Sequence, residues 1–306
     1  MRPHIMNNLN VVVALTTRDN DYQAEQAAAV AEMASRLGIK IEVIYADNDA
    51  VNQTQQLVKI IQSDKKPSAI LVEPVGTGMP QVARAAVAAK IGWGIINNEP
   101  EYLPELRRSG LPVFSISTDQ FEVGRIQGDQ ISALVQKGNI LYIEGPVSTM
   151  AAQLRTKGMM TTKPDAVALK TLKGDWTERS AQRAVQSWLS LASSRQLHIQ
   201  AVICQNDAMA MGARKAMGDL TEEDREKWQQ LPFTGVDGVT KTGQEWVKRG
   251  MLQATIITAP AAGTALEMLV KAVYGGTIPP ERTLLAPKSF PSIAELQKSR
   301  GQRAGG

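Results

Sequence analysis

The chain has 306 residues, of which 43% are hydrophobic and 21% charged, with a formal net charge of +4. This composition is typical of a soluble globular protein, and the length corresponds to about two domains. One cysteine, Cys204, and two histidines, His4 and His198, exclude an internal disulfide, a paired-cysteine redox site and a cysteine–histidine zinc site. A serine–histidine–aspartate relay would depend on one of these histidines, and we expect neither a metal nor a cofactor.

The distribution of charged and aromatic residues indicates no nucleic-acid partner. Lysines and arginines are interleaved with acidic residues, as in 222–227, which we interpret as the solvated face of a helix. Aromatic residues make up 5% of the chain, too few for a base-stacking platform. No apolar stretch reaches the length of about 18 residues that spans a membrane. The first ten residues show no signal peptide, so we expect either a cytoplasmic protein or a mature or trimmed chain.

The first part of the chain alternates short apolar runs with segments of helical periodicity. The predicted strands are Leu9–Leu15, Ile39–Tyr45, Ser68–Val72, Trp93–Ile96 and Val113–Ser117. The predicted helices between them are Tyr22–Leu37, Val51–Asp64 and Gln81–Lys90. Alternation at this spacing indicates βαβ units and a mainly parallel sheet. The segment Asn97–Pro112 contains three prolines and interrupts the alternation, so we expect an excursion there, either a rim of a cleft or a surface loop.

The alternation then starts again. The predicted strands are Ile140–Ile143, Val167–Leu172, Ala201–Cys204, Phe233–Val236 and Leu252–Ile257, with a final strand near Thr283–Leu285. The predicted helices are Gly124–Gln136, Thr149–Met160, Thr177–Ala192, Ala208–Met217, Thr240–Arg249 and Ala261–Tyr274. We expect residues 301–306 to be frayed. The pattern predicts an α/β protein with two doubly wound halves.

Polar side chains and two aromatics follow the predicted strands, where open parallel sheets bind their ligands. They are Arg18–Tyr22, Glu73, Asn97, Asn98, 145–153, 174–176, 205–207, Asp237 and Thr258. Carboxylates and amides bind hydroxyl groups, and flat aromatic faces cover the apolar surface of a sugar ring. This set favours a neutral ligand rich in hydroxyls. The alternative is that each Asn or Asp merely begins a turn or caps a helix.

Other motifs have structural interpretations. Gly76-Thr77-Gly78 precedes a predicted helix, but Gln81 stands where a dinucleotide loop has its third glycine, so we expect a tight turn. We expect Cys204 to be buried, His198 to be solvated, and Met209, Met211 and Met217 to pack in a core. No nucleophile is paired with a base, so we expect no enzyme.

The chain resembles the ribose-binding-protein branch of the type I periplasmic sugar-binding proteins over roughly residues 9–290. The most specific stretch is QAVICQNDAMAMGA at Gln200–Ala213. The supporting matches are Asn20-Asp21-Tyr22, Asp119 with Gly124 and Gly128, Gly235–Gly238 and Gln253–Ile256. The order and spacing of these motifs together carry the resemblance.

The resemblance implies two Rossmann-like lobes joined by a three-crossover hinge, with a ligand cleft between them. The first lobe would be residues 1–116 plus 259–285, and the second 117–258 plus 286–306. It implies a non-catalytic, monomeric binding protein that captures a sugar or polyol by hinge closure. The protein would deliver this ligand to the membrane permease of an ABC transporter from a periplasmic or extracytoplasmic location. The alternative is the sugar-sensing domain of a signalling receptor or regulator.

The resemblance also implies roles for individual residues. Asn20 and Tyr22 match the first-lobe wall, Trp176 the opposing aromatic, Asn206 and Asp237 hydroxyl-binding residues, and Thr258 a hinge position that often holds Gln. Asn97 and Asn98 replace an Asp-Arg pair, Gln153 replaces an Arg, and Glu73 stands where Asn is common. Since two guanidinium groups are lost and two carboxylates are present, we expect an anionic ligand to be disfavoured. A neutral sugar or polyol fits this set, and a cationic ligand stays open.

Overall fold

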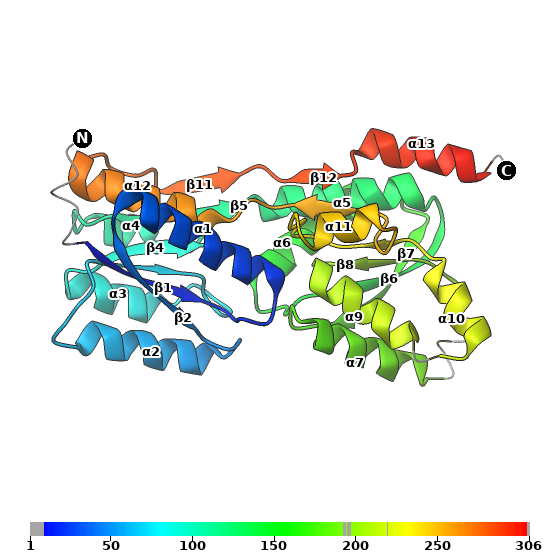
Figure 1. Cartoon of the computed structure of the whole chain (residues 1–306), viewed down its shortest axis with the longest axis horizontal. Coiled ribbons are helices and arrows are strands. Elements are labelled where there is room, and N and C mark those ends of the chain that lie inside the picture. Colours follow the sequence, from blue (N-terminus) through cyan, green and yellow to red (C-terminus); the bar gives the residue numbers. More distant parts are fainter. Residues whose placement is uncertain (1–8, 192–193, 195–196, 219, 305–306) are drawn as a thin grey trace. The chain divides into compact units, whose positions relative to one another are not determined.

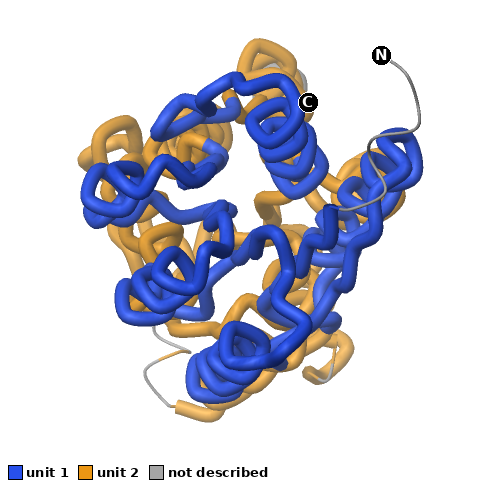
Figure 2. The backbone as a smooth tube through the Cα atoms, turned by 90° about the vertical axis from the view of Figure 1, so that its left-hand side faces the viewer, with its two compact units in different colours: residues 1–118, 260–285 blue, residues 119–259, 286–306 orange. Residues whose placement is uncertain are grey.

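The computed structural model describes residues 9–191, 194, 197–218 and 220–304 and divides into two compact units. Unit 1 comprises residues 1–118 and 260–285, and unit 2 comprises residues 119–259 and 286–306 (Figure 2). The sequence predicts lobe boundaries after residues 116, 258 and 285, and the two units divide after residues 118, 259 and 285. His4 lies outside the described residues.

Unit 1 is built on a six-stranded parallel sheet with the strand order β11-β5-β4-β3-β1-β2. The strands are β1 (Asn10–Leu15), β2 (Lys40–Tyr45), β3 (Ala69–Val72), β4 (Gly92–Ile96), β5 (Val113–Thr118) and β11 (Arg282–Leu285). Val13 of β1 lies between Val43 and Leu71 of its two neighbours. The central strands are apolar throughout because both faces of the sheet are covered.

Helices cover the two faces of this sheet (Figure 1). They are α1 (Asp21–Leu37), α2 (Ala50–Gln62), α3 (Pro80–Ala88), α4 (Leu103–Arg107) and α12 (Ala261–Gly275). Helices α1 and α12 pack with Val11 and Val13, whereas α2, α3 and α4 pack with Val12 and Ala14. This division follows from the alternation of side chains along β1. Helix α1 ends at Gly38, whose left-handed φ of 65° suits a glycine C-cap.

The segment Asn97–Pro112 is not an excursion, contrary to the prediction. It contains α4, whose Leu103 and Leu106 are buried in the same core as the apolar residues of α2 and α3. The Arg107 guanidinium at the end of this helix donates to the carbonyl oxygens of Val113 at 2.7 Å and Pro279 at 3.0 Å. The segment is therefore the crossover between β4 and β5. A five-residue helix with proline in its first turn is too short to show a periodic pattern.

Unit 2 contains a four-stranded parallel sheet with the strand order β7-β6-β8-β9. Its strands are β6 (Gly138–Glu144), β7 (Val167–Lys173), β8 (Ile199–Cys204) and β9 (Phe233–Thr234). An antiparallel pair, β10 (Thr255–Ile257) with β12 (Lys288–Phe290), lies beside β9 through bridges from Thr234 to Ala254 and from Asp237 to Ile257. The predicted α/β class with doubly wound parallel sheets is confirmed.

The helices of unit 2 are α5 (Gln120–Leu134), α6 (Met150–Thr162), α7 (Glu178–Leu189), α9 (Asp207–Gly218), α10 (Glu222–Gln229), α11 (Gly243–Lys248) and α13 (Ile293–Ala304). Helices α7 and α9 cover one face of the sheet, and α5 and α6 cover the other. As predicted, Cys204 is buried, the three methionines of α9 pack in the core, and His198 is exposed. Helix α10 has no buried residue, which confirms the interpretation of 222–227 as a solvated face.

The end of the chain differs from the prediction. Helix α13 continues to Ala304, so residues 301–304 are helical and not frayed. Ser292 and Glu295 form reciprocal hydrogen bonds at its start, with Ser292 N donating to Glu295 Oε2 at 2.8 Å and Glu295 N to Ser292 Oγ at 3.3 Å. Leu296 packs against Ala133 and Ala254. In the described part of the chain, no helix is both long enough and apolar enough to cross a membrane.

Candidate functional site

In unit 1, the predicted residues gather around Tyr22, in the first turn of α1 after β1. The Tyr22 hydroxyl accepts hydrogen bonds from Asn97 Nδ2 and Gln26 Nε2, both at 3.0 Å. Asn97 follows β4 and also donates through Nδ2 to Glu73 Oε1, just after β3, at 3.2 Å. The carboxyl ends of β1, β3 and β4 therefore bring an aromatic ring, an amide and a carboxylate together. We call Tyr22, Gln26, Glu73 and Asn97 the unit-1 cluster.

Two of the predicted residues of unit 1, Asn20 and Asn98, lie outside the unit-1 cluster. Asn20 is the N-cap of α1, and its side chain accepts a hydrogen bond from Gln23 N at 2.8 Å, as the capping interpretation expects. Asn98 is buried, with 5% of its surface exposed. In the sequence, Asn98 directly follows Asn97 after β4, and Asn20 lies two residues before Tyr22 in the segment after β1.

Sequence reasoning missed Gln26, which fixes the phenol ring of Tyr22. Its Nε2 donates to the Tyr22 hydroxyl, and its Oε1 accepts from Ala262 N at 2.8 Å, which joins α1 to the start of α12. Gln26 is fully buried and lies four residues after Tyr22, one helical turn away. A glutamine one helical turn after a candidate aromatic residue was the signal that the sequence offered.

In unit 2, the aromatic ring is that of Trp176, in the loop between β7 and α7. The guanidinium carbon of Arg155 lies over this ring, 5.4 Å from its centroid. Asn206, after β8, donates through Nδ2 to the Trp176 carbonyl oxygen at 2.9 Å. Gly145, after β6, lies so close that a Cβ built on it would be 2.3 Å from Cη2 of the ring. We call Gly145, Arg155, Trp176 and Asn206 the unit-2 cluster.

Asp207 belongs to the predicted strand-end residues but was assigned no role of its own, and it connects α9 to the next loop. Its Oδ2 accepts from Gly238 N at 2.9 Å, and its Oδ1 accepts from the Thr255 hydroxyl at 2.7 Å. These bonds tie the start of α9 to the loop after β9 and to β10. The signal in the sequence was the Asn-Asp pair of the resembling motif, of which only the Asn was assigned a role.

Asp237 and Thr258 lie together in this part of unit 2. Asp237 is buried, with a φ of 109°, and its carbonyl oxygen accepts from Thr258 N at 3.1 Å. Thr258 is also buried and lies one residue before the end of this chain segment of unit 2. A φ in this region is unusual for a residue other than glycine, and such residues concentrate at functional sites.

Gln153 is exposed on α6, and its Nε2 donates to the Val147 carbonyl oxygen at 2.7 Å. The buried face of the helix instead carries Ala152, Arg155 and Met159, at helical spacing. Arg155 is thus the guanidinium of α6 that is buried beside Trp176, and sequence reasoning missed it. The spacing of the apolar residues of α6 could have identified it.

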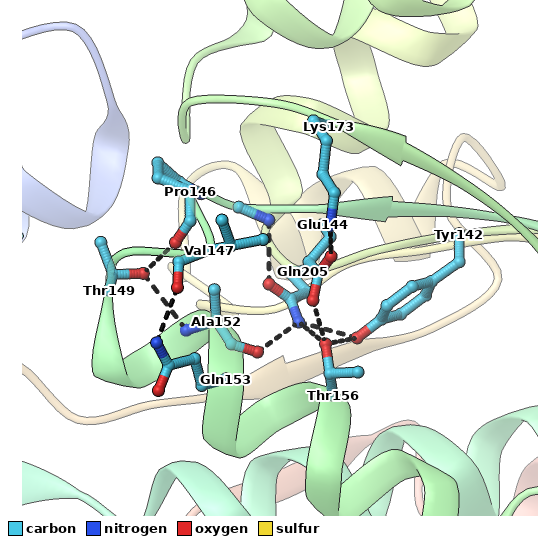
Figure 3. A network of polar contacts seen from close by, with 11 residues as sticks. Tyr142, Glu144, Pro146, Val147, Thr149, Ala152, Gln153, Thr156, Lys173 and Gln205 are labelled. Atoms are coloured by element: carbon cyan, nitrogen blue, oxygen red, sulfur yellow. Dashed lines mark hydrogen bonds and ion pairs between the residues drawn. The ribbon is translucent and has the colours of Figure 1, made fainter.

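Behind the unit-2 cluster lies a network of polar contacts (Figure 3). Gln205 Nε2 donates to Tyr142 Oη at 2.7 Å and to Thr156 Oγ1 at 3.0 Å, and its Oε1 accepts from Gly145 N at 2.9 Å. Burial raises the pKa of Tyr142 to about 12, against the opposing effect of the hydrogen bonds with Thr156 and Gln205. Gln205 therefore holds the backbone of Gly145 and is itself bonded to the buried, neutral phenol of Tyr142.

Glu144 closes the network at the end of β6. Its carboxylate accepts from the Thr156 hydroxyl at 2.6 Å and forms an ion pair with Lys173 at the end of β7. Glu144 is buried, whereas Lys173 is exposed. Among the residues that the structure describes, no group of three or more His, Cys, Asp and Glu side chains could hold a metal ion.

The sequence profile described as periplasmic binding protein domain matches residues 11–277, so the chain belongs to this family. One relative is the D-allose-binding periplasmic protein of Escherichia coli strain K12, 24% identical over 88% of this chain and 86% of the relative. Another is the D-apiose import binding protein of Paraburkholderia graminis, 26% identical over 90% of this chain and 85% of the relative. Both relatives are named as binding proteins, not as enzymes.

The fold is shared with solved structures. One is an ABC transporter solute binding protein from Bacillus halodurans C-125 with bound myo-inositol. It superposes with a TM-score of 0.78 at 20% identity, over 96% of this chain and 98% of that protein. At this identity the similarity shows the fold. The suspected membership in the type I periplasmic binding proteins is therefore confirmed.

Proposed function

We propose that this protein is a non-catalytic solute-binding protein that captures a neutral sugar or polyol for an ABC importer. One observation carries the proposal: each unit places an aromatic ring beside an amide side chain at the carboxyl ends of its parallel strands, with the carboxylate of Glu73 in unit 1 and the guanidinium of Arg155 in unit 2. Open α/β sheets bind ligands at this edge. The relatives named for D-allose and D-apiose support a sugar as the ligand class.

The hydrogen bonds of the unit-1 cluster favour a ligand that donates. Asn97 directs Nδ2 to both Tyr22 and Glu73, and its Oδ1 accepts from the Tyr22 hydroxyl at 3.4 Å. An amide oxygen has two lone pairs, so Oδ1 can accept one further hydrogen bond from a ligand. The Glu73 carboxylate is also an acceptor. Hydroxyl groups of a sugar or polyol supply the matching donors, whereas a carboxylate or phosphate ligand would be repelled.

The unit-2 cluster favours a neutral ligand over a cationic one. The positive guanidinium of Arg155 already lies over the Trp176 ring. A ligand cation stacked on the same ring would compete for its π-electrons and be repelled by this charge. The uncharged C–H face of a sugar ring meets no such repulsion.

In the proposed mechanism, the ligand contacts residues of both units, and hinge closure is favoured because all these contacts exist only in the closed state. The ligand set is Asn20, Tyr22, Glu73, Asn97, Asn98, Gln153, Trp176, Asn206, Asp237 and Thr258. The closed, monomeric protein would then be recognised by the membrane permease. The proposed compartment is periplasmic or otherwise extracytoplasmic, and nucleic acid has no part in the function.

A thermal-shift screen across pentoses, hexoses, polyols and cyclitols tests this proposal. A ligand at 100 times its Kd stabilises the folded state by about 2.7 kcal/mol, which raises Tm measurably. Calorimetry on the best compound would follow, with Trp176→Ala as the site variant and Trp228→Ala as the matched control, because the partly buried Trp228 ring packs edge-on against Trp188 at 5.8 Å and lies outside the unit-2 cluster. We expect weaker binding in the first variant alone. A screen without any shift, together with null titrations, would overturn the proposal.

A further inference from the structure

The backbone of Trp176 is in a conformation that a bulky residue rarely adopts. Its φ is 72°, in the left-handed region, where a side chain clashes with the neighbouring carbonyl group. Such a conformation persists only where the surroundings over-determine it. The contacts of Trp176 must therefore favour this arrangement strongly enough to offset the clash.

Asn206 holds the backbone of Trp176. Its Nδ2 donates to the Trp176 carbonyl oxygen at 2.9 Å, while its Oδ1 accepts from Met209 N at 2.9 Å in the first turn of α9. Both polar ends of the side chain are therefore bonded within unit 2. With 3% of its surface exposed, Asn206 has little area left for a ligand.

Arg155 and Gly145 hold the ring. Arg155 lies over the ring and is itself fixed, since Nε donates to Gln120 Oε1 at 2.8 Å and Nη1 donates to the Gln205 carbonyl oxygen. Its exposed fraction is 6%, so the guanidinium is held by α5 and the end of β8 and not by solvent. Gly145 allows the ring to lie where any side chain would overlap it.

We infer that Asn206 and Arg155 are positioning residues, which set the orientation of Trp176 before any ligand binds. Asn206, a member of the proposed ligand set, then also influences affinity through its hold on Trp176. The inference rests on the proposed function only in taking Trp176 as part of the ligand site. The orientation itself is a property of the ligand-free protein.

The test uses fluorine NMR of the full chain, in which all five tryptophans are labelled as 5-fluorotryptophan. The Trp176 resonance is assigned by its loss in Trp176→Phe. Asn206→Ser keeps an oxygen for Met209 N but cannot reach the Trp176 carbonyl, and Arg155→Lys keeps the charge but loses the planar stack. The matched controls are Asn52→Ser, which removes a similar amide-to-carbonyl bond at 3.1 Å in unit 1, and Arg183→Lys, exposed on α7.

In the ligand-free protein, we expect the Trp176 resonance to shift or broaden in both site variants, with the other four signals unchanged. The affinity for the strongest compound of the sugar and polyol screen should fall by roughly tenfold, comparable to the loss of one cation–π or hydrogen-bond contact. Neither control should change the resonance or the affinity. Far-UV circular dichroism during thermal unfolding verifies that each variant folds, and the two site variants report independently.

A Trp176 resonance that is unchanged in both variants would overturn the inference. If affinity nevertheless fell in Asn206→Ser, Asn206 would bind the ligand directly. A resonance that shifts without any change in affinity would overturn the link between orientation and binding. Failure of the proposed function is separate, because it would appear as the absence of binding to every compound in the unmodified protein.

Discussion

The two units hold their candidate aromatic residues in different ways. Tyr22 has an ordinary helical backbone in α1, and its ring is fixed by hydrogen bonds to the hydroxyl from Gln26 and Asn97. Trp176 has a left-handed backbone, and its ring is fixed by an arginine over it and a glycine beside it. The ring of Tyr22 is held by polar groups, whereas the position of Trp176 depends on polar groups and also on shape, since Gly145 leaves room for the ring. The first should therefore be sensitive to the loss of a polar atom, and the second also to the addition of an apolar one.

The largest expected effect tests the role of shape in unit 2. Gly145→Val places a side chain where the Trp176 ring lies, since even a Cβ would be 2.3 Å from the ring. We expect the free energy of unfolding to fall by about 1–3 kcal/mol, as in other overpacked sites. We also expect ligand affinity to fall at least as far as in Trp176→Ala. Gly218→Ala is the control, because its Cβ would meet nothing within 4 Å. An unchanged affinity in Gly145→Val, measured by calorimetry, would remove Trp176 from the site.

The next prediction compares the two aromatic residues directly. Tyr22→Ala and Trp176→Ala should each lower sugar affinity by roughly 1–3 kcal/mol, by analogy with the loss of base–aromatic stacking. Titration calorimetry of the two single variants and the double variant measures this. Equal losses would mean that both rings contact the ligand. Affinity that is unchanged in both single variants would show that the assigned residues do not form the pocket.

A third prediction concerns the network behind the unit-2 cluster. Burial raises the pKa of Tyr142 to about 12, above its ordinary value of 10.0, so the folded state retains the phenol proton longer than the unfolded state. This contribution to the free energy of unfolding is complete below pH 10 and is lost as the pH rises towards 12. The loss should be about 2 kcal/mol.

Chemical denaturation between pH 9 and 12 measures this loss as the difference between the unmodified protein and Tyr142→Phe. The variant keeps the contribution of Tyr102, whose pKa is also raised by burial, so that contribution cancels in the comparison. Parallel pH profiles for the two proteins would mean that Tyr142 is not buried as a neutral phenol.

The smallest expected effect tests the polar support of Tyr22. Gln26→Leu keeps the volume of the side chain but removes the donor to the Tyr22 hydroxyl and the acceptor for Ala262 N. We expect affinity to fall by about 1 kcal/mol, the usual net contribution of a hydrogen bond. Gln23→Leu is the control, since Gln23 is equally buried on α1 but accepts from Thr16 N. Equal effects of both substitutions would indicate a general weakening of α1.

The sequence predicted most strands and helices because their patterns are local. A buried parallel strand such as β1 is a continuous apolar run, and α1 has a capping Asn20 before it and Gly38 after it. The short helix α4 was missed because five residues are too few for periodicity. Helix α13 was missed because its burial depends on Leu296 meeting residues from distant parts of the chain.

The candidate site, too, could be predicted from the sequence only in part. Trp176 and Asn206 could be selected because they follow strands and match a family motif. The contact of Arg155 with Trp176 could not, because the two residues come from α6 and from the loop after β7. The choice between Gln153 and Arg155 depends on which face of α6 packs inward, and this face is decided by packing against α5.

The sequence by itself determined the α/β class, the family resemblance and the residue types available at the strand ends, because these follow from local pattern and composition. The scarcity of histidine and cysteine likewise needed no structure. Only the tertiary structure decided which polar groups are already bonded to one another, as Asn206 is to Trp176 and Met209. A hydrogen bond depends on positions in space, and residues far apart in the chain reach those positions only when the sheet and its helices pack.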